Sequence, residues 1–226
     1  MKVELTTIGE IHSPFKEKFG VPRQSGLVDV KQTIVIEPYY SYMDAFSELT
    51  EHKYIWVIFI FDNPVSKVFR PKVRPPRLGG NKKWGVFSTR SPFRPNPIGM
   101  SKVKLTGIKK SGGAVVLEIE GGDFLHLTKV VDIKPHIAYC DNVSEPTENI
   151  FRKAPEKKVE VSFSRDLFED QPEIKKEIND ILALDPRPAY QVKKDHYSFK
   201  YQNLDVTFKV TDQNQFHVVS TTEISE

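Results

Sequence analysis

Short apolar runs separated by turn residues dominate this 226-residue sequence and limit the folds that it can adopt. Sixteen prolines and twelve glycines interrupt the apolar pattern, and both residue types favour turns over long helices. The pattern therefore argues against a helical bundle. A hydrophobic fraction of 38% still supplies enough apolar surface for a buried core, which argues against wholesale disorder.

Most apolar runs in the first part of the chain have the alternation or the β-branched composition of strands. A single short helix is predicted over Asp44–Leu49, with Asp44 as its N-cap. Lys109–Gly113 is suited to a hairpin turn. Several short strands joined by turns predict a β-barrel or a sandwich, and nothing alternates as in a doubly wound sheet. The predicted strands are Val3–Ile11, Thr33–Ile36, Tyr54–Phe61, Trp84–Phe87, Lys102–Ile108 and Ala114–Ile119.

The last part of the chain has a different pattern. Residues 141–158 mix prolines, asparagines and charges without periodicity, which is typical of a linker. A helix is predicted over Glu173–Leu184, directly after Pro172. We therefore predict a mainly β domain over residues 1–142, a linker over 143–158 and a small α+β domain over 159–226. The strands predicted in the last domain are Val159–Phe163, Tyr197–Tyr201, Leu204–Val210 and Phe216–Ser220.

The sequence predicts a cytoplasmic protein without a membrane span. The longest apolar run, Ile55–Phe61, has seven residues, whereas a spanning helix needs about 20. We expect no export signal, because the residues after Met1 lack an apolar segment. Cys140 is the only cysteine, which excludes an internal disulfide framework and fits a reducing compartment.

The net charge of only +3 hides a strongly basic band over residues 64–110. The band contains thirteen Lys or Arg residues and no Asp or Glu, which leaves 20 basic against 30 acidic residues elsewhere. Ordinary solvated surfaces mix the two signs. An acidic body with one basic band indicates a polyanionic partner.

The same band is rich in proline, with seven between Pro64 and Pro97. Proline stiffens the backbone, so the interleaved arginines would be held in place, and a fixed Arg suits bidentate binding of phosphate or carboxylate. Phe93 beside Arg94 offers a flat face for a base or an adenine ring. The alternative is a surface loop with structural prolines.

The sequence lacks the motifs of several common enzyme classes. The sequence contains no dinucleotide or phosphate-loop glycine motif and no Gly-x-Ser-x-Gly elbow. The six histidines form no His-x-x-x-His pair and no Cys-x-x-Cys motif is present, so we expect no metal site. Two smaller clusters remain. The first is Val130–His136, whose Asp-Lys pair is in isolation typical of a structural ion pair. The second is Asp185–Tyr190, where Arg187 lies between two prolines.

The sequence closely resembles the TsaA-like, or TrmO/YaeB, family of tRNA methyltransferases, over almost its whole length. The block Arg90–Met100 is the most specific of the matching stretches. The others are Ile8–Phe19, Val21–Val28, Val73–Asn81, Gly85–Ser101, Val131–Pro135 and Asp185–Tyr190. The resemblance implies a β-barrel methyltransferase of non-Rossmann type, with a small C-terminal domain, that binds S-adenosylmethionine and acts as a homodimer. The implied reaction is methylation of N6 of N6-threonylcarbamoyladenosine at position 37 of threonine tRNA.

The resemblance also assigns roles to individual positions. Asp62 and Asn63 differ from the side chains common in the family, so a main-chain role is expected there. His126–Lys129 replaces the usual Asp-Gly-Thr-Pro, near the cofactor in relatives, and this departure could shift the substrate preference. The expected cofactor-binding residues are Pro22, Arg23, Gln24, Asp62, Asn63, Arg90, Met100 and His126. The expected tRNA-binding or substrate-binding residues are Arg74, Arg77, Lys82, Lys83, Arg94, Asn96, Lys134 and Arg187.

For catalysis we hypothesise that alignment of the nitrogen with the donated methyl group supplies much of the acceleration. Because the ureido carbonyl makes the N6 proton more acidic, a nearby acceptor would help, and Asp132 and Tyr190 are the candidates. Arg94 or Arg187 suits the threonyl carboxylate. Two alternatives are a non-catalytic RNA-binding module that uses the basic band and a methyltransferase acting on a free nucleoside or metabolite.

Overall fold

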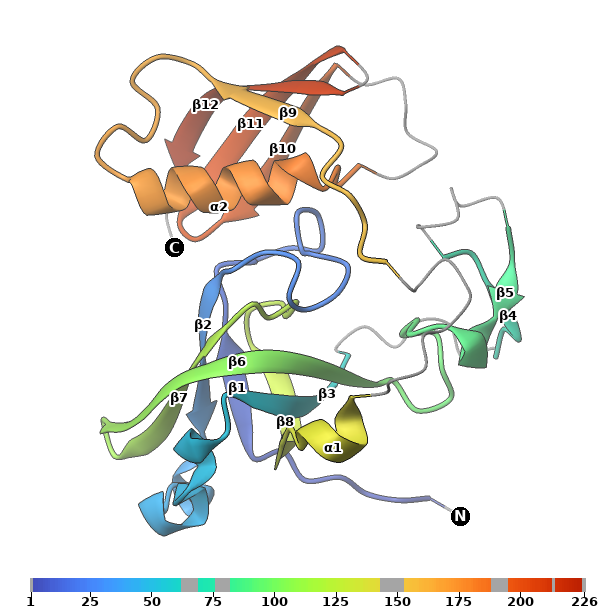
Figure 1. Cartoon of the computed structure of the whole chain (residues 1–226), viewed down its shortest axis with the longest axis vertical. Coiled ribbons are helices and arrows are strands. Elements are labelled where there is room, and N and C mark those ends of the chain that lie inside the picture. Colours follow the sequence, from blue (N-terminus) through green and yellow to red (C-terminus); the bar gives the residue numbers. More distant parts are fainter. Residues whose placement is uncertain are drawn as a thin grey trace.

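Six antiparallel strands close into a barrel in the first half of the chain (Figure 1). The computed structural model describes residues 2–61, 69–75, 82–142, 153–187, 195–212 and 214–224. The strands follow one another around the barrel in the order β1-β2-β7-β6-β3-β8, and β8 pairs with β1 to complete the circle. They are β1 (Gly9–His12), β2 (Lys31–Ile36), β3 (Tyr54–Ile60), β6 (Ile98–Ser111), β7 (Ala114–Glu120) and β8 (Thr128–Pro135).

Alternation along the strands fills the barrel. On β3, Ile55, Val57 and Phe59 are buried, whereas the residues between them are partly exposed. Gly99 on β6 lies directly against the Phe59 ring, where a Cβ atom would come within 2.3 Å of it. The glycine therefore allows the large ring to pack inside the barrel.

A second unit consists of a four-stranded sheet and one helix (Figure 1). The strand order is β10-β11-β12-β9, with β9 parallel to β12. Buried Ile178, Ile181 and Leu182 of the helix α2 belong to the same apolar cluster as the sheet. The bounds are β9 (Glu160–Phe163), α2 (Pro172–Ala183), β10 (His196–Tyr201), β11 (Leu204–Asp212) and β12 (Gln215–Glu223).

The segment that follows β1 ties the two units together. Phe15 is fully buried in the core of the second unit and forms an isolated β-bridge with Tyr201. The Phe15 carbonyl also accepts a hydrogen bond from the His126 N–H (2.8 Å), next to the start of β8. The core of the second unit is therefore completed by residues from the N-terminal part of the chain, including Val28 and Val30.

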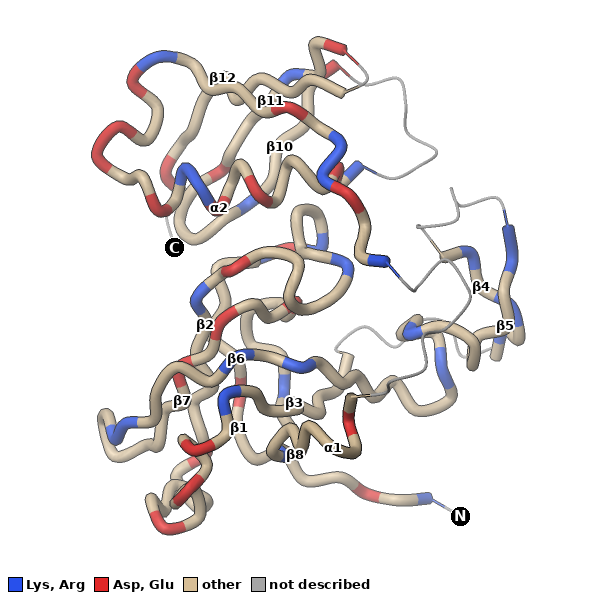
Figure 2. The backbone as a smooth tube through the Cα atoms, viewed as in Figure 1, with Lys and Arg blue, Asp and Glu red and all other residues tan. Residues whose placement is uncertain are grey.

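Residues 69–75 and 82–88 of the basic band form a small projection beside the barrel, which we call the basic projection, whereas residues 98–110 of the band lie on β6 in the barrel wall. Two-residue strands β4 (Lys72–Val73) and β5 (Trp84–Gly85) pair there, and a 3-10 turn over Val86–Ser88 follows (Figure 1). Figure 2 shows Lys and Arg gathered along β4 and β5. A short helix α1 (Ala138–Asp141) ends the barrel unit. Among the described residues, no helix is both long enough and apolar enough to cross a membrane.

The structure corrects four local predictions. Residues 44–49 form 3-10 turns rather than a helix, because left-handed Glu48 (φ 59°) interrupts the segment. The first of these turns has Tyr42, not Asp44, at its N-cap. Residues 3–8 belong to no strand, since strand pairing in the barrel begins at Gly9. Only Trp84–Gly85 of the predicted strand 84–87 is extended. The hairpin turn narrows to Gly112 and Gly113, both with positive φ.

Candidate functional site

Three segments far apart in the sequence meet beside the barrel. The Arg23 guanidinium donates a hydrogen bond from Nη2 to the main-chain oxygen of Arg187 (3.2 Å). Arg90 Nη1 in turn donates to the side-chain oxygen Oε1 of Gln24 (3.0 Å). Pro22, which is buried, immediately precedes these loop residues. The fold thus brings together five positions that the resemblance assigns to cofactor or substrate.

A partly buried carboxylate lies next to this group. Asp123 Oδ1 accepts a hydrogen bond from the Ser101 hydroxyl at 2.6 Å. Burial raises the pKa of Asp123, against the lowering effects of Ser101, the Arg90 charge and the main-chain N–H of Ser25. Asp123 was not predicted as a site residue, because an isolated Asp after two glycines has no recognisable pattern in the sequence. We call Gln24, Arg90, Ser101 and Asp123 the carboxylate cluster.

The Arg187 side chain is held by a carboxylate and by an aromatic ring. Its Nε and Nη2 donate to Oδ1 and Oδ2 of Asp185 at 2.7 and 2.9 Å. Its guanidinium carbon lies 4.7 Å from the centre of the Phe216 ring. The Asp185 carboxylate raises the pKa of Arg187. A carboxylate of the protein itself therefore already matches the charge of Arg187.

Arg94 is anchored by neutral groups instead. Its Nη1 donates to the carbonyl oxygens of Val86 (3.2 Å) and Thr89 (2.7 Å). Its guanidinium carbon lies 5.2 Å from the centre of the Phe87 ring. These contacts fix the direction of the side chain without neutralising its charge. Asn96, two residues further on, is exposed.

Met100 and Asp132 lie on the outer surface of the barrel. In the strand register Ile58 of β3 is opposite both Met100 of β6 and Asp132 of β8. Because successive side chains alternate, the Met100 side chain points away from the face on which Ser101 contacts Asp123. Asp132 Oδ2 forms an ion pair with Lys134 (2.8 Å), and its side chain is 44% exposed. Met100 can therefore contribute to the carboxylate cluster through its main chain only.

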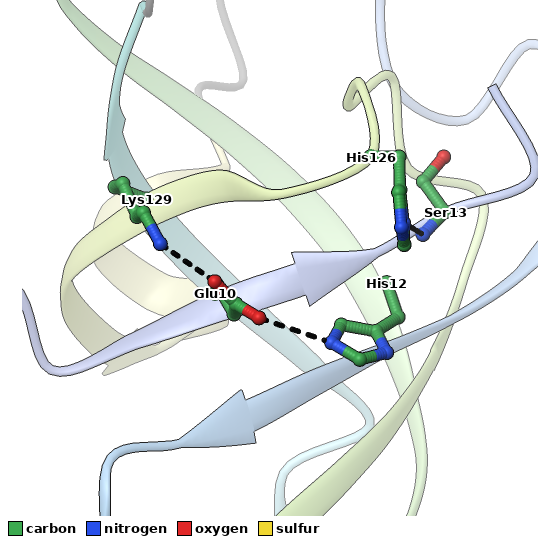
Figure 3. A network of polar contacts seen from close by, with 5 residues as sticks. All are labelled: Glu10, His12, Ser13, His126 and Lys129. Carbon is green, nitrogen blue, oxygen red and sulfur yellow. Dashed lines mark hydrogen bonds and ion pairs between the residues drawn. The ribbon is translucent and has the colours of Figure 1, made fainter. Parts of the chain in front are cut away.

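His126 has a separate set of neighbours, shown in Figure 3. Its Nδ1 accepts a hydrogen bond from the Ser13 N–H at 3.3 Å, and its ring centre lies 5.3 Å from that of His12. The fold therefore places His126 against the end of β1 rather than among the side-chain contacts of the carboxylate cluster. Leu127, which follows it, has a left-handed backbone with φ 65°.

The remaining predicted residues flank the basic projection or fall outside the structure. Arg74 directly follows β4, and Lys83 directly precedes β5, with Lys82 beside it. Asp62, Asn63, Arg77 and Tyr190 lie outside the described residues. Within the part of the chain that the structure describes, no group of three or more His, Cys, Asp or Glu residues could hold a metal ion.

Comparison with known families decides the identity of the fold. A model of the tRNA-methyltransferase O N-terminal domain matches residues 10–142, and a model of the TrmO C-terminal domain matches residues 156–224. The chain belongs to the tRNA-methyltransferase O family. The resemblance seen in the sequence motifs is thereby confirmed, and so is the mainly β fold with a barrel.

Relatives of the chain share most of its length. The tRNA (adenine(37)-N6)-methyltransferase of Escherichia coli K12 is 39% identical over 217 residues, which cover 91% of this chain and 92% of that protein. The RcsF protein of Pseudomonas aeruginosa is 36% identical, with the same coverage, and its name describes an S-adenosylmethionine-dependent methyltransferase. A crystal structure of TrmO from Pseudomonas aeruginosa superimposes with a TM-score of 0.75 at 28% identity, covering 98% of this chain and all of that one.

The side chains of this TrmO-family site fit S-adenosylmethionine by their chemistry. That molecule carries a carboxylate, an ammonium group, ribose hydroxyls and an adenine ring. Arg23 and Arg90 supply donors for a carboxylate, and the Asp123 carboxylate can accept from an ammonium group or a hydroxyl. Phe93, which is 40% exposed, offers an apolar face close to these residues in sequence. Both charges of the amino acid portion thus have a partner of opposite sign.

Proposed function

We propose that this protein transfers the methyl group of S-adenosylmethionine to N6 of N6-threonylcarbamoyladenosine at position 37 of tRNA, with threonine tRNA as substrate. The S-adenosylmethionine-dependent methylation of N6 of adenine 37 follows from membership of the family and from the names of its relatives. The threonylcarbamoyl group and the choice of threonine tRNA are our proposal.

The carboxylate cluster is the observation that carries the proposal. Gln24 and Arg90 are joined by a hydrogen bond although they are 66 residues apart. The partly buried Asp123 lies beside them, held by Ser101. A carboxylate that burial destabilises is retained where a ligand uses it, and an ammonium group is a suitable ligand. We assign this cluster to the amino acid portion of the cofactor.

The residues of the chain mainly position the reactants. S-adenosylmethionine supplies the electrophilic methyl group when it is bound. The protein must align N6 with that group and accept the N6 proton as the new N–C bond forms. Asp132 is our proposed acceptor, because its carboxylate is 44% exposed on the outer face of the barrel, where a bound tRNA can reach it. Tyr190 is the second candidate.

We propose that Arg94 binds the threonyl carboxylate of the substrate. The hydrogen bonds that its Nη1 donates go to main-chain carbonyls, so its positive charge is left for an anion. Arg187 was an equal candidate from the sequence. Its pairing with both oxygens of Asp185 makes it the weaker one, since a substrate carboxylate would compete with an existing ion pair.

The basic projection is proposed to bind the tRNA backbone. Lys134 adds a basic side chain, 63% exposed, on the outer face of the barrel. The projection itself carries Lys72 on β4 and, next to its two strands, Arg74, Lys82 and Lys83. Phosphate contacts of this kind release counterions, so affinity for tRNA should fall steeply as salt rises.

Three further expectations stay proposals. We propose that the protein is cytoplasmic and that it acts as a homodimer. Exposed apolar side chains on β6, Ile98 and Met100, are compatible with a partner on that face. We also propose that residues 1–142 and 159–226 are separate domains joined by 143–158, a division close to the limits of the two family models.

A methylation assay with two batches of threonine tRNA tests the proposal. One batch carries threonylcarbamoyl at adenosine 37 and the other lacks it, and both are incubated with the protein and methyl-labelled S-adenosylmethionine. Label in the modified tRNA alone is the expected result. Label in both batches, or in the free modified nucleoside as readily as in tRNA, would contradict the proposed substrate. Cofactor binding that cannot be detected at all would favour a non-catalytic RNA-binding module.

A matched pair of variants tests the carboxylate contact. Arg94→Gln should raise the KM for modified tRNA about tenfold or more, as expected for loss of a charge-assisted hydrogen bond worth about 1.5–3 kcal/mol. Arg165→Gln removes an exposed arginine of the second unit and serves as the control. Equal KM values for the two variants would eliminate Arg94 as the carboxylate partner.

A further inference from the structure

A pocket of about 1030 Å³ lies where the barrel meets the second unit. Its walls come from the end of β1, from β2 and β7, and from the turn between β10 and β11. Of the described residues that were assigned to the cofactor or the tRNA, His126 alone lines it. We call this space the junction pocket, and the residues that matter below are His12, Lys16, Glu118, Glu120, His126 and Lys200.

The acidic side chains of the junction pocket are already matched. Glu118 forms an ion pair with Lys109, and Glu120 forms one with Lys104 at 2.6 Å. Lys31, which also lines the pocket, is paired with Glu173 of α2. These three pairs contribute no net charge to the pocket.

Two other lysines of the junction pocket differ from these pairs. Among the described residues, no carboxylate lies within ion-pair distance of the ammonium group of Lys16 or of Lys200. The Glu17 carboxylate touches Lys200, but through the main-chain N–H of that residue, from which it accepts a hydrogen bond (3.0 Å). Both lysines are exposed and come from different units of the fold. The junction pocket therefore has a surplus of positive charge.

His126 adds a directed donor, and His12 packs beside it (Figure 3). Because His126 Nδ1 accepts from the Ser13 N–H, the neutral ring carries its proton on Nε2, which is then a hydrogen-bond donor. His12 Nε2 is bound to Glu10 Oε1 (3.2 Å), and Lys129 holds the other oxygen of that carboxylate (2.6 Å). Glu10 is thus engaged by two partners and fixes the His12 ring beside His126.

We propose that the junction pocket binds a phosphate group through Lys16, Lys200 and the Nε2–H of His126. Ammonium and imidazole N–H groups are donors only in this arrangement, which suits an anion with several acceptor oxygens. A volume of about 1030 Å³ exceeds what a lone ion fills and accommodates a nucleotide. The phosphate belongs either to the backbone of the tRNA, an assignment that rests on the proposed function, or to a free anion.

Binding at this pocket is linked to protonation. Burial, Lys16 and His12 lower the pKa of His126, and Glu10 opposes them. A bound phosphate would act in the opposite direction and favour the imidazolium. Of the other charged groups near the pocket, Lys200 lines it and Lys129 is paired with Glu10. Glu118 and Glu120 are paired with Lys109 and Lys104. A phosphodiester, whose single negative charge is constant over this range, should therefore bind more tightly as the pH falls toward 6.

Proton NMR of the histidine rings of the full-length protein tests the pocket. Inorganic phosphate is added at pH 6.5, with sodium chloride at equal ionic strength as the reference, and His126→Gln and His12→Gln identify the two resonances. We expect phosphate, but not chloride, to shift both resonances and to raise the pKa of His126. The combined change Lys16→Gln with Lys200→Gln should weaken this binding at least tenfold. Lys18→Gln, an exposed neighbour that does not line the pocket, should not change it. Equal shifts with chloride, or in the double variant, would overturn the proposal.

The source of the phosphate is assigned by a second measurement. The logarithm of tRNA affinity is plotted against the logarithm of salt concentration for the wild type and the double variant. Loss of a backbone contact should make the slope shallower by about 1. If the slope is the same in both proteins while phosphate shifts the histidine resonances of the wild type only, the pocket is assigned to a free anion. Failure of the proposed methylation would appear in the wild-type assay and leaves the phosphate titration unaffected.

Discussion

Both oxygens of the Asp185 carboxylate accept hydrogen bonds from the guanidinium group of Arg187, at 2.7 and 2.9 Å. Asp185 itself has a left-handed backbone in the turn that joins the two residues. The main-chain oxygen of the same Arg187 accepts from Arg23. The turn after α2 therefore connects the second unit to the loop that leads into the carboxylate cluster. Arg187, which the sequence predicts to bind substrate, thus contacts both units, and its role in substrate binding stays a prediction.

Neutralising Asp185 should loosen this support. Asp185→Asn tolerates the left-handed backbone but removes the negative charge that acts on both Arg23 and Arg187. We expect the Kd for S-adenosylmethionine, measured by calorimetry, to rise about five- to tenfold, in line with roughly 1 kcal/mol for a weakened charge-assisted contact. Asp170→Asn, an exposed acid before α2, is the control. An unchanged Kd in Asp185→Asn would show that the turn does not support the cofactor.

Removing the charge of Asp123 should separate stability from binding. Its pKa is raised in the folded protein, so the folded state holds its proton more tightly than the unfolded state does. Stability is consequently lost as the pH rises above the ordinary value of 3.8, and Asp123→Asn should be more stable than the wild type at pH 7.5. Its affinity for S-adenosylmethionine should fall about tenfold or more. Urea unfolding and calorimetry measure the two effects, with exposed Asp29→Asn for comparison. Full cofactor affinity in Asp123→Asn would remove this residue from the site.

His126 should make the protein sensitive to mild acid. Because its pKa is lowered in the folded state, its contribution to stability is complete above the unfolded value of 6.5 and is lost as the pH falls through the folded value. Protonation of Nδ1 also ends the hydrogen bond from the Ser13 N–H. Between pH 7.5 and 5, the free energy of unfolding should fall less in His126→Gln than in the wild type. His196→Gln, on the exposed face of β10, should behave like the wild type. Parallel curves for His126→Gln and wild type would contradict the prediction.

Leu127 occupies a position that favours glycine. Its φ of 65° costs a residue with a Cβ atom about 1–2 kcal/mol, and its side chain is 45% exposed. Leu127→Gly should therefore stabilise the protein by about 0.5–1 kcal/mol, after the entropy of glycine in the unfolded chain is subtracted. Leu127→Ala keeps the Cβ atom and should bring no gain. Thermal unfolding compares the three proteins, and equal stabilisation by both substitutions would rule out backbone strain as the cause.

Truncation of Phe15 should weaken the second unit as well as the barrel. The ring is fully buried in the core that α2 and its sheet form, and it lies edge-on to Tyr201 at 5.6 Å. Phe15→Ala should cost about 3–5 kcal/mol. Exposed Tyr39→Ala is the aromatic control. Urea unfolding followed in both units by fluorescence and by NMR should show the loss in each, and a loss confined to the barrel would contradict the shared core.

Local sequence patterns were sufficient where a segment needs only its own periodicity. The strand at Tyr54, the helix after Pro172 and the hairpin at Gln202–Asn203 lie where alternation, spacing and turn residues indicate them. Residues 44–49 show the limit. Their helical composition is too short a signal, and the left-handed Glu48 interrupts the segment instead of continuing a helix.

The sequence by itself determined the strand-rich architecture, the basic band and the family, because these depend on composition, periodicity and the motif around Arg90. Only the tertiary structure decided which residues act together. Asp123 meets Ser101 across 22 residues, and Arg187 meets Asp185 and Arg23 instead of an open site. His126 faces His12 across 114 residues. The physical reason is that charge, burial and hydrogen bonding are properties of neighbours in space, and closing the barrel brings distant segments together in ways that no local pattern records.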